Sequence, residues 1–338
     1  MDTTPAAVTK AVLFGDTYGI EADLYDNIRM GGIAHIFAVS GLHVGALFGF
    51  CLLLMRKTPL KHTANPLRFL TVATLLFIYA GVCGFSASVV RAMVICLISY
   101  LGRLLWVKTD FLQSLGAAAI IILLFTPSAL FEVGFQLSFA ACLGLALLTK
   151  PIGQVCDHGY KLYRKIVPIK RTEEQLAILS TGDTLPPTIG ERVYRTAASF
   201  FSATTAAQIA TAPLLLHYFG YLSGWATLLN CLFVPLISAL FSALLVFVVL
   251  ASILPAICAS AVLFLPNAVW SALLLLFQAV DFSSFALSGL ILYAGACVCY
   301  YAACVFSTDK WNLDTKLKYI LSVTSILGFV ATMVVLNV

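Results

Sequence analysis

Long apolar segments constrain this chain more than any other feature of its sequence. Val234–Leu254 contains no charged residue, and similar runs recur along most of the 338 residues. About twenty apolar residues suffice for a helix to cross the hydrocarbon core of a bilayer. A membrane β-barrel would instead show alternating segments of about ten residues, and helices are the other structure that satisfies its backbone in lipid. The sequence therefore predicts an all-α, polytopic helical membrane protein.

Composition points to the same class. Hydrophobic residues make up 61% of the chain and charged residues 10%, whereas a soluble domain typically contains about 25% charged residues. A soluble fold of this size could not cover so much apolar surface. Nine of the ten cysteines lie within or beside the apolar runs without metal-ligand spacing, so we interpret them as packing residues. We expect neither a metal nor a cofactor.

The charged residues predict an orientation in the membrane. We expect about ten spans, and in that arrangement seventeen of the twenty Lys and Arg residues fall on one side. Cytoplasmic loops are enriched in these residues, so this side is predicted to be cytoplasmic. Residues 1–30 then form an extracellular N-terminal segment, and residues 31–338 a transmembrane domain with a cytoplasmic insertion at 150–196. The predicted spans are 33–55, 67–84, 87–106, 112–127, 130–149, 197–222, 226–250, 255–278, 285–306 and 318–337.

Polar side chains inside spans are costly and are therefore the best pointers to function. Ser40 and His43 stand three residues apart in the first span, and His35 would lie about 80° from His43 around one continuous helix. Either these residues line a cavity or each histidine bonds to a neighbouring helix; a zinc site is a weaker idea because no HExxH pattern occurs. The same span contains glycines at every fourth position, a spacing that predicts close helix packing: Gly41, Gly45 and Gly49.

Further polar residues recur in the other odd-numbered spans. Arg91 lies in the third span, where an arginine costs about 2.5–3.5 kcal/mol at the helix centre on insertion scales. It either extends to the lipid headgroups or faces an anion. Gln136 and Ser138 lie early in the fifth span and Asn230 early in the seventh. Because these spans all run inward, His35 and these residues would share a similar depth. That predicts an outward-opening vestibule, with coincidence as the alternative.

Several of these segments, taken in order, resemble the ComEC family of competence proteins. The resemblance runs from about residue 10 to 300 and implies a helical competence domain. Such a domain forms a channel that translocates single-stranded DNA across the bacterial cell (plasma) membrane during natural transformation, without enzymatic activity of its own. The segments that carry the resemblance are Gly31–Val44, Gly84–Ala92, Phe135–Phe139, Ala212–Pro213, Tyr218–Gly220 and Asn230–Pro235.

The resemblance also implies partners and roles for individual residues. The partners would be single-stranded DNA, the lipid bilayer and other competence proteins, namely a DNA receptor and a cytoplasmic helicase-type motor; a homo-oligomer is compatible with it. Arg91 would meet phosphate groups of the passing strand. The remaining candidates for the DNA path are His35, Ser40, His43, Gln136, Ser138 and Asn230.

Two other functions compete with a DNA channel. A small-molecule or lipid transporter would use the same vestibule, and helix breaks such as Pro213 suit moving helices. A membrane-embedded hydrolase would use Ser40 and His43, although their segment contains no orienting carboxylate. Many members of the family carry an OB-like domain before this core and a metallo-β-lactamase-like domain after it. The sequence contains neither, so we expect a fragment or a core that works with partners.

Overall fold

The computed structural model describes residues 5–57, 66–166 and 188–253, with short pieces further along the chain. Those pieces are residues 264, 268–275, 280, 286–288, 300–302, 304, 321 and 324–325. The chain divides into two compact units. The first contains Met1–Cys142 and Ala212–Ile291, and the second contains Leu143–Thr211 and Leu292–Val338.

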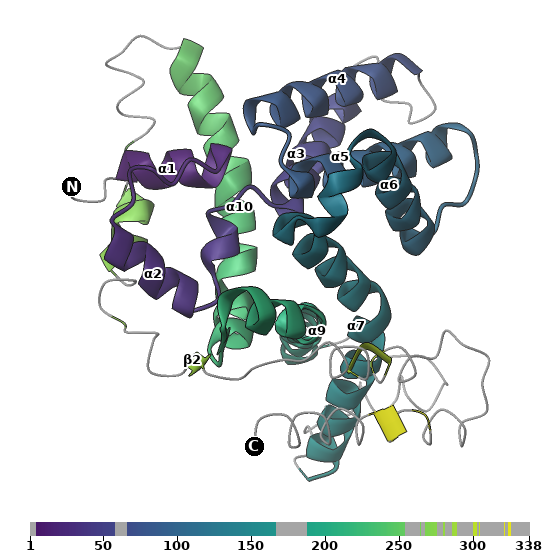
Figure 1. Cartoon of the computed structure of the whole chain (residues 1–338), viewed down its shortest axis with the longest axis vertical. Helices are drawn as coiled ribbons and strands as arrows, with labels where there is room; N and C mark the ends of the chain where they lie inside the picture. Colours follow the sequence, from purple (N-terminus) through teal and green to yellow (C-terminus); the bar gives the residue numbers. More distant parts are fainter. Residues whose placement is uncertain are drawn as a thin grey trace, which may run out of the picture. The chain divides into compact units, whose positions relative to one another are not determined.

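Helices dominate the described residues (Figure 1). They are α1 (Pro5–Phe14), α2 (Ala22–Met30), α3 (Gly41–Leu54), α4 (Pro66–Val82), α5 (Ala87–Leu104), α6 (Phe111–Phe125), α7 (Val133–Ile166), α9 (Ile189–Phe219) and α10 (Ala226–Ile253). Three 3-10 turns accompany them: η1 (Ala34–Ile36), η2 (Met55–Lys57) and η3 (Pro127–Phe131). Two short strands, β1 (Tyr221–Ser223) and β2 (Ala286–Ser288), pair antiparallel with Leu222 opposite Leu287. The predicted all-α class is confirmed.

Each of the first seven predicted spans overlaps an α-helix of the structure. Within the described part of the chain, four helical segments are long and apolar enough to cross a membrane. They are Ala34–Leu54, Ala87–Leu104, Val133–Tyr160 and Ile189–Phe219. Pro66–Val82, Phe111–Phe125 and Ala226–Phe241 are apolar but shorter. The last three predicted spans lie largely outside the described residues, so the count of ten stays a prediction.

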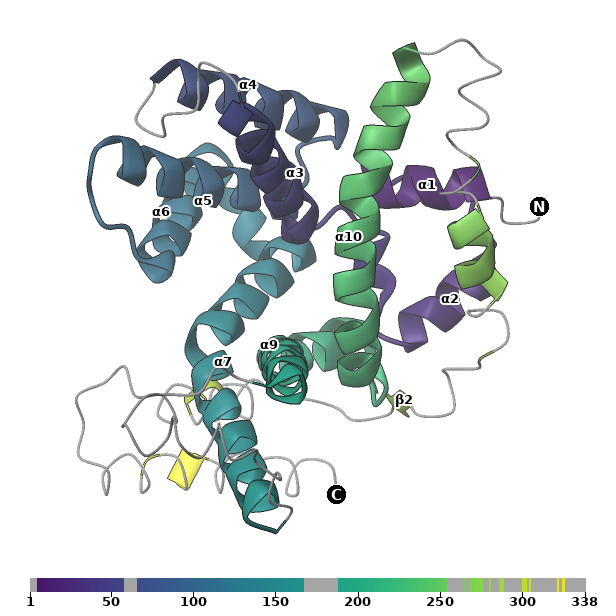
Figure 2. The same cartoon turned by 180° about the vertical axis from the view of Figure 1, so that it is seen from behind.

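The first unit is held together by a core between α3, α4, α5 and α10. In both views α10 runs beside α1 and α3, and these helices are in contact (Figure 1, Figure 2). Phe37, Tyr100, Phe233 and Phe241 are almost fully buried in this core. Large aromatic side chains contribute strongly to such packing because each buries about 150–250 Å².

The N-terminal helix α1 belongs to the same core. Val8, Ala11 and Val12 are at most 1% exposed, and their spacing of three and one places them on one helix face. The Tyr79 hydroxyl of α4 donates a hydrogen bond to the Leu13 carbonyl at 3.0 Å. Residues 5–30 therefore pack as part of the first unit, and their predicted extracellular location stays a prediction.

A tight turn between α4 and α5 determines where Arg91 lies. Gly84 and Phe85 both adopt positive φ angles, 67° and 50°, a conformation that is uncommon outside glycine. The Phe85 amide donates to the Ala80 carbonyl at 2.8 Å, which satisfies the end of α4. Ser86, with φ −55° and ψ 147°, then precedes the first residue of α5. The turn places Arg91 in the second turn of α5.

The first predicted span is not one continuous helix. His35 lies in η1, residues 38–40 are not helical, and α3 begins at Gly41. Ser40 is the N-cap residue of α3, and its backbone N–H donates to Nδ1 of His43 at 3.0 Å. This side-chain cap favours a helix start at that point. The predicted angle of about 80° between His35 and His43 around the helix axis assumed an unbroken helix and is therefore wrong.

Helices α7 and α9 continue into the segment predicted as a cytoplasmic insertion. At 1.5 Å per residue the 34 residues of α7 extend about 51 Å, well beyond a hydrocarbon core of about 30 Å. In the second unit the rings of Tyr160 and Tyr194 stack with centroids 4.1 Å apart. The Tyr194 hydroxyl also donates to the Cys156 carbonyl at 2.7 Å. The insertion is thus helical up to Ile166 and again from Ile189.

We predict that this insertion faces the cytoplasm and that both termini face outward. The variants Pro5→Cys, Gln175→Cys and Asn312→Cys would each be labelled in intact cells with a membrane-impermeant maleimide, in a background where the native cysteines are replaced. We expect reaction at position 5 in intact cells, and at positions 175 and 312 only after permeabilisation. Labelling of position 175 from outside would contradict the orientation derived from the Lys and Arg distribution.

Candidate functional site: a buried cation at the start of three helices

The first two turns of α3, α5 and α7 meet in the first unit. Helices α3 and α5 are in contact, and a Cβ built on Gly41 would lie 3.4 Å from the Ala92 Cβ. Helices α5 and α7 are joined by a hydrogen bond between the hydroxyls of Ser88 and Ser138 at 3.0 Å. The structure therefore brings together residues of the predicted first, third and fifth spans.

His43 lies on the inner side of this junction. The residue is 1% exposed, and its ring packs edge-on against Phe241 with centroids 4.6 Å apart. Its Nδ1 atom lies 3.0 Å from both the backbone nitrogen and the hydroxyl oxygen of Ser40. Nε2 is buried and has no hydrogen-bond partner among the described residues. His43 thus caps α3, and no carboxylate of the described residues orients its ring as a hydrolase would require.

Arg91 lies beside the first residue of α3. Its side chain is 6% exposed, and Nη2 lies 3.0 Å from the position that a Cβ on Gly41 would occupy. The guanidinium carbon lies 5.8 Å from the ring centroid of Phe139, and the thiol of Cys142 is adjacent. Nε and Nη1 are buried without a hydrogen-bond partner among the described residues. Arg91 therefore places a buried positive charge at a helix start.

No carboxylate balances this charge in the described part of the chain. The one ion pair found there joins Arg29 and Asp26 at 3.6 Å. An unpaired buried charge is costly, so proteins normally pair it or leave it accessible to an ion or water. The site can thus offer a cation to an anionic group without first breaking an internal salt bridge.

A second buried arginine lies at the opposite end of α3. Arg68 is 2% exposed, and its Nη2 donates to the Leu52 carbonyl at 2.9 Å. The last four carbonyls of a helix lack intrahelical partners, and a cation is favourable at that negative end. Arg68 is therefore a structural brace. Sequence reasoning missed this role because it counted Arg68 only as one of the seventeen basic residues on the predicted cytoplasmic side.

Removal of this brace should destabilise the protein. We expect Arg68→Leu to lower membrane abundance and melting temperature in detergent, because a hydrogen bond to a charged group contributes about 1.5–3 kcal/mol. Arg56→Leu is the matched control, since it removes the same charge from an exposed residue near the end of α3. Equal melting temperatures for the two variants would contradict the role of Arg68 as a brace.

The other predicted site residues make contacts of their own. Gln136 accepts a hydrogen bond from the Tyr218 hydroxyl at 2.8 Å and donates to the Leu130 carbonyl at 2.9 Å. Asn230 is 9% exposed, and its Oδ1 lacks a partner among the described residues. His35 is exposed on η1 and lies close enough to His43 to interact with it electrostatically. The structure thus gathers Ser40, His43, Arg91 and Ser138, while a common vestibule with the other three stays a prediction.

The predicted glycine face makes close contact at one position. Gly41 approaches Arg91 and Ala92, as described above. A Cβ on Gly45 or Gly49 would meet no described atom within 4 Å, and both residues are exposed. Within the described residues, the spacing of glycines therefore overstates the extent of the packed surface.

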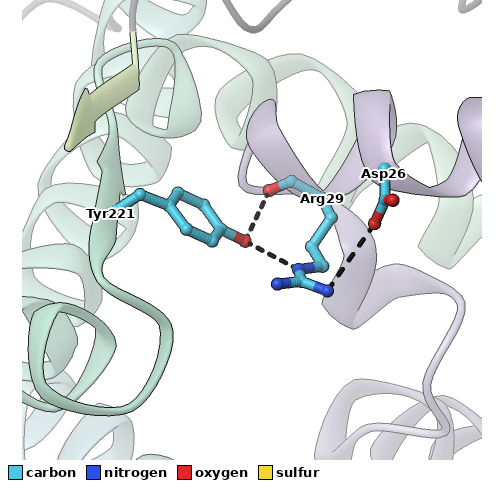
Figure 3. Close-up of polar contacts among 3 residues, drawn as sticks. All are labelled: Asp26, Arg29 and Tyr221. Carbon is cyan, nitrogen blue, oxygen red and sulfur yellow. Dashed lines mark hydrogen bonds and ion pairs between the residues drawn. The ribbon is translucent and has the colours of Figure 1, made fainter.

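Arg29, in the same unit, is an arginine whose charge is paired with a carboxylate. Arg29 Nε donates to the Tyr221 hydroxyl at 3.3 Å, and that hydroxyl donates to the Arg29 carbonyl at 3.2 Å (Figure 3). The guanidinium also lies 5.6 Å from the Phe219 ring centroid, and Asp26 is its ion-pair partner. The bond to Tyr221 raises the pKa of Arg29 above its usual value. This cluster joins α2 to β1, and its carboxylate distinguishes it from Arg91.

The described residues contain no group of three or more His, Cys, Asp or Glu side chains that could hold a metal ion. The candidate site is therefore defined by a buried guanidinium, a helix start and a pair of hydroxyls within a bundle of apolar helices. These features describe a helical protein with candidate membrane spans and a buried cation at a helix start.

Comparison with known proteins identifies the family. A family model described as competence protein matches residues 12–312, and the chain belongs to that family. The chain is 32% identical over 149 residues to ComE operon protein 3 of Bacillus subtilis (strain 168), which covers 44% of this chain and 19% of that protein. No solved structure matches the chain.

Two mycoplasma proteins are also similar. The uncharacterized protein MG316 homolog of Mycoplasma pneumoniae is 32% identical over 127 residues, covering 38% of this chain and 32% of that protein. The uncharacterized protein MG316 of Mycoplasma genitalium is 29% identical over 158 residues, covering 47% and 38%. The matched regions thus span between 19% and 38% of the length of these relatives.

Proposed function

We propose that this chain forms the membrane channel through which single-stranded DNA enters a bacterial cell during natural transformation. It works as a multi-pass protein of the plasma membrane, with no enzymatic activity of its own. Membership of the competence protein family supports the process. The observation that carries the proposal at residue level is the buried Arg91, which has no carboxylate partner among the described residues.

The physical argument concerns charge in an apolar bundle. A guanidinium in the interior of a membrane protein is retained where it faces a pathway or a partner. Single-stranded DNA supplies one negative phosphate per nucleotide, so a cation beside its path meets a counter-ion repeatedly. The three helix starts around Arg91 also contribute the hydroxyls of Ser88 and Ser138. Such a path would bind the strand weakly at each step and release it to the next phosphate.

The proposed partners follow from the same process. A DNA receptor would deliver the strand from outside, and a cytoplasmic helicase-type motor would supply the energy, since the sequence contains no P-loop. The parts of α7 and α9 that continue into the predicted insertion at 150–196 would lie on the cytoplasmic side, where that motor would act.

A transporter of small molecules or lipids is the second candidate, because it would use the same charge. The two functions differ in the substrate that accumulates in cells. In a transformable bacterium that carries this gene, deletion should leave labelled DNA bound outside but abolish its conversion to a DNase-resistant, single-stranded form. Re-expression of the gene should restore uptake. Unchanged DNase-resistant uptake in the deletion strain would refute the proposed function.

A further inference from the structure

The start of α3 has the features of an anion site whose backbone donors are still available. The Ser40 N–H is used by His43 Nδ1, and the N–H groups of His43 and Val44 both point to the Ser40 carbonyl, at 3.1 and 3.4 Å. The N–H groups of Gly41 and Leu42 have no hydrogen-bond partner among the described residues. Unpaired N–H groups and the helix dipole together make a helix start attractive to anions.

Arg91 provides a second, independent indication of a ligand. It is more than nine-tenths buried, its Nη2 reaches the first residue of α3, and its Nε and Nη1 atoms are unpartnered among the described residues. The positive end of a helix dipole repels a cation unless an anion lies between them. A guanidinium at this place is therefore favourable when a negative group binds to it and to the helix start together.

The two buried arginines beside α3 make this contrast clear. Arg68 lies at the carboxyl end, where the dipole favours a cation and the Leu52 carbonyl accepts its hydrogen bond. Arg91 lies at the amino end, where the dipole disfavours it. The arginine at the negative end of α3 thus donates to a helix carbonyl, whereas the arginine at its positive end has no carbonyl or carboxylate partner among the described residues.

We propose that Arg91 and the N–H groups of Gly41 and Leu42 bind one phosphodiester group. A planar guanidinium presents parallel N–H donors that match two oxygens of a phosphate, and the amides can hold a third. The group can reach the helix start because Leu42 is 38% exposed and Gly41 is partly exposed. The inference rests on the proposed function for its source of phosphodiester, the DNA backbone; a phospholipid headgroup carries the same chemistry.

Gly41 has a specific role in this site because it leaves room for the guanidinium. An alanine Cβ would lie 3.0 Å from Nη2, tighter than an ordinary van der Waals contact, so the guanidinium would have to shift. Nη2 is the end of a flexible side chain, and the change therefore moves the cation without disrupting the helix. Gly45→Ala is the matched control, because no described atom lies within 4 Å of its Cβ.

The test measures binding of a fluorescent single-stranded oligonucleotide to the purified full chain in nanodiscs, at several salt concentrations. We expect Arg91→Gln to weaken binding about tenfold or more. It should also reduce the slope of log K against log salt by about 0.7, the value for one phosphate of a single strand. The affinity of Gly41→Ala should lie between those of Arg91→Gln and the parent, and the affinity of Gly45→Ala should match that of the parent. A methylphosphonate oligonucleotide, which lacks the charge, should bind all four proteins equally weakly.

Equal affinity and equal salt slope for the parent and Arg91→Gln would overturn the site, provided that Arg91→Gln melts at the same temperature as the parent or higher. The lipid composition separates the two sources of phosphodiester. If phosphatidylglycerol displaces the oligonucleotide from the parent, and Arg91→Gln abolishes lipid binding but leaves DNA uptake intact, the phosphodiester site stands. In that case Arg91 binds lipid, and the proposed DNA channel has no support from this residue.

Discussion

We expect Arg91→Gln to lose nearly all DNA uptake while the protein reaches the membrane at its normal level. The substitution removes the charge that would meet each phosphate. It also removes an unpaired buried charge, which is a destabilising feature of the parent. Thermal stability in detergent should therefore stay equal to that of the parent or increase. The measurement is uptake of labelled DNA in the full-length parent gene, divided by the amount of protein in the membrane.

Arg91→Lys distinguishes charge from geometry at the same position. Lysine retains a positive charge but lacks the planar, two-pronged donor arrangement of arginine. We expect this variant to retain part of the uptake, at a level between Arg91→Gln and the parent. If uptake fell only in proportion to protein abundance in both variants, Arg91 would be a structural brace like Arg68. Full uptake by Arg91→Gln would exclude a role in DNA passage.

The largest structural effect is expected at Gly144, where α7 and α9 approach closely in the second unit. Gly144 is buried, and a Cβ there would lie 2.6 Å from the Ala206 carbonyl oxygen and still closer to the Ala210 Cβ. A backbone oxygen cannot move aside as a flexible side chain can. Small residues permit such contact between membrane helices. We expect Gly144→Leu to prevent assembly, observed as loss of monodisperse protein after extraction from the membrane.

Gly159→Leu is the matched control on the same helix. Gly159 is exposed, and no described atom lies within 4 Å of a Cβ built on it. Leucine favours a helix over glycine by about 0.5–1 kcal/mol, so both substitutions should help the isolated helix. Normal assembly of Gly144→Leu would show that the two helices do not need this contact.

The apolar runs predicted the helices well because burial in lipid leaves the backbone few alternatives. The prediction of one continuous helix across residues 33–55 was wrong at Ser40, where a cap starts a new helix within an apolar segment. The usual sequence signal for such a cap is Glu or Gln three residues after Ser, whereas here His43 occupies that position. The burial of α1 was also missed, although the spacing of Val8, Ala11 and Val12 already defines an apolar face.

The candidate site was partly predictable for a related reason. Arg91 stands out in the sequence because a charge inside an apolar span is costly. Its position against Gly41 is a contact between helices, which no spacing within one span can reveal. The bracing contact of Arg68 was missed because an arginine near a loop fits the positive-inside pattern as well as it fits a helix brace.

The most direct test of a DNA path past the start of α3 is photocrosslinking during uptake. A photoreactive amino acid at Leu42, which adjoins the proposed phosphodiester site, would be illuminated while labelled DNA enters the cell. Leu124 of α6, which is 75% exposed, is the control position. The account predicts a covalent adduct with single-stranded DNA at position 42 and none at position 124. Uptake that continues without any adduct at position 42, or with equal adducts at both positions, would contradict it.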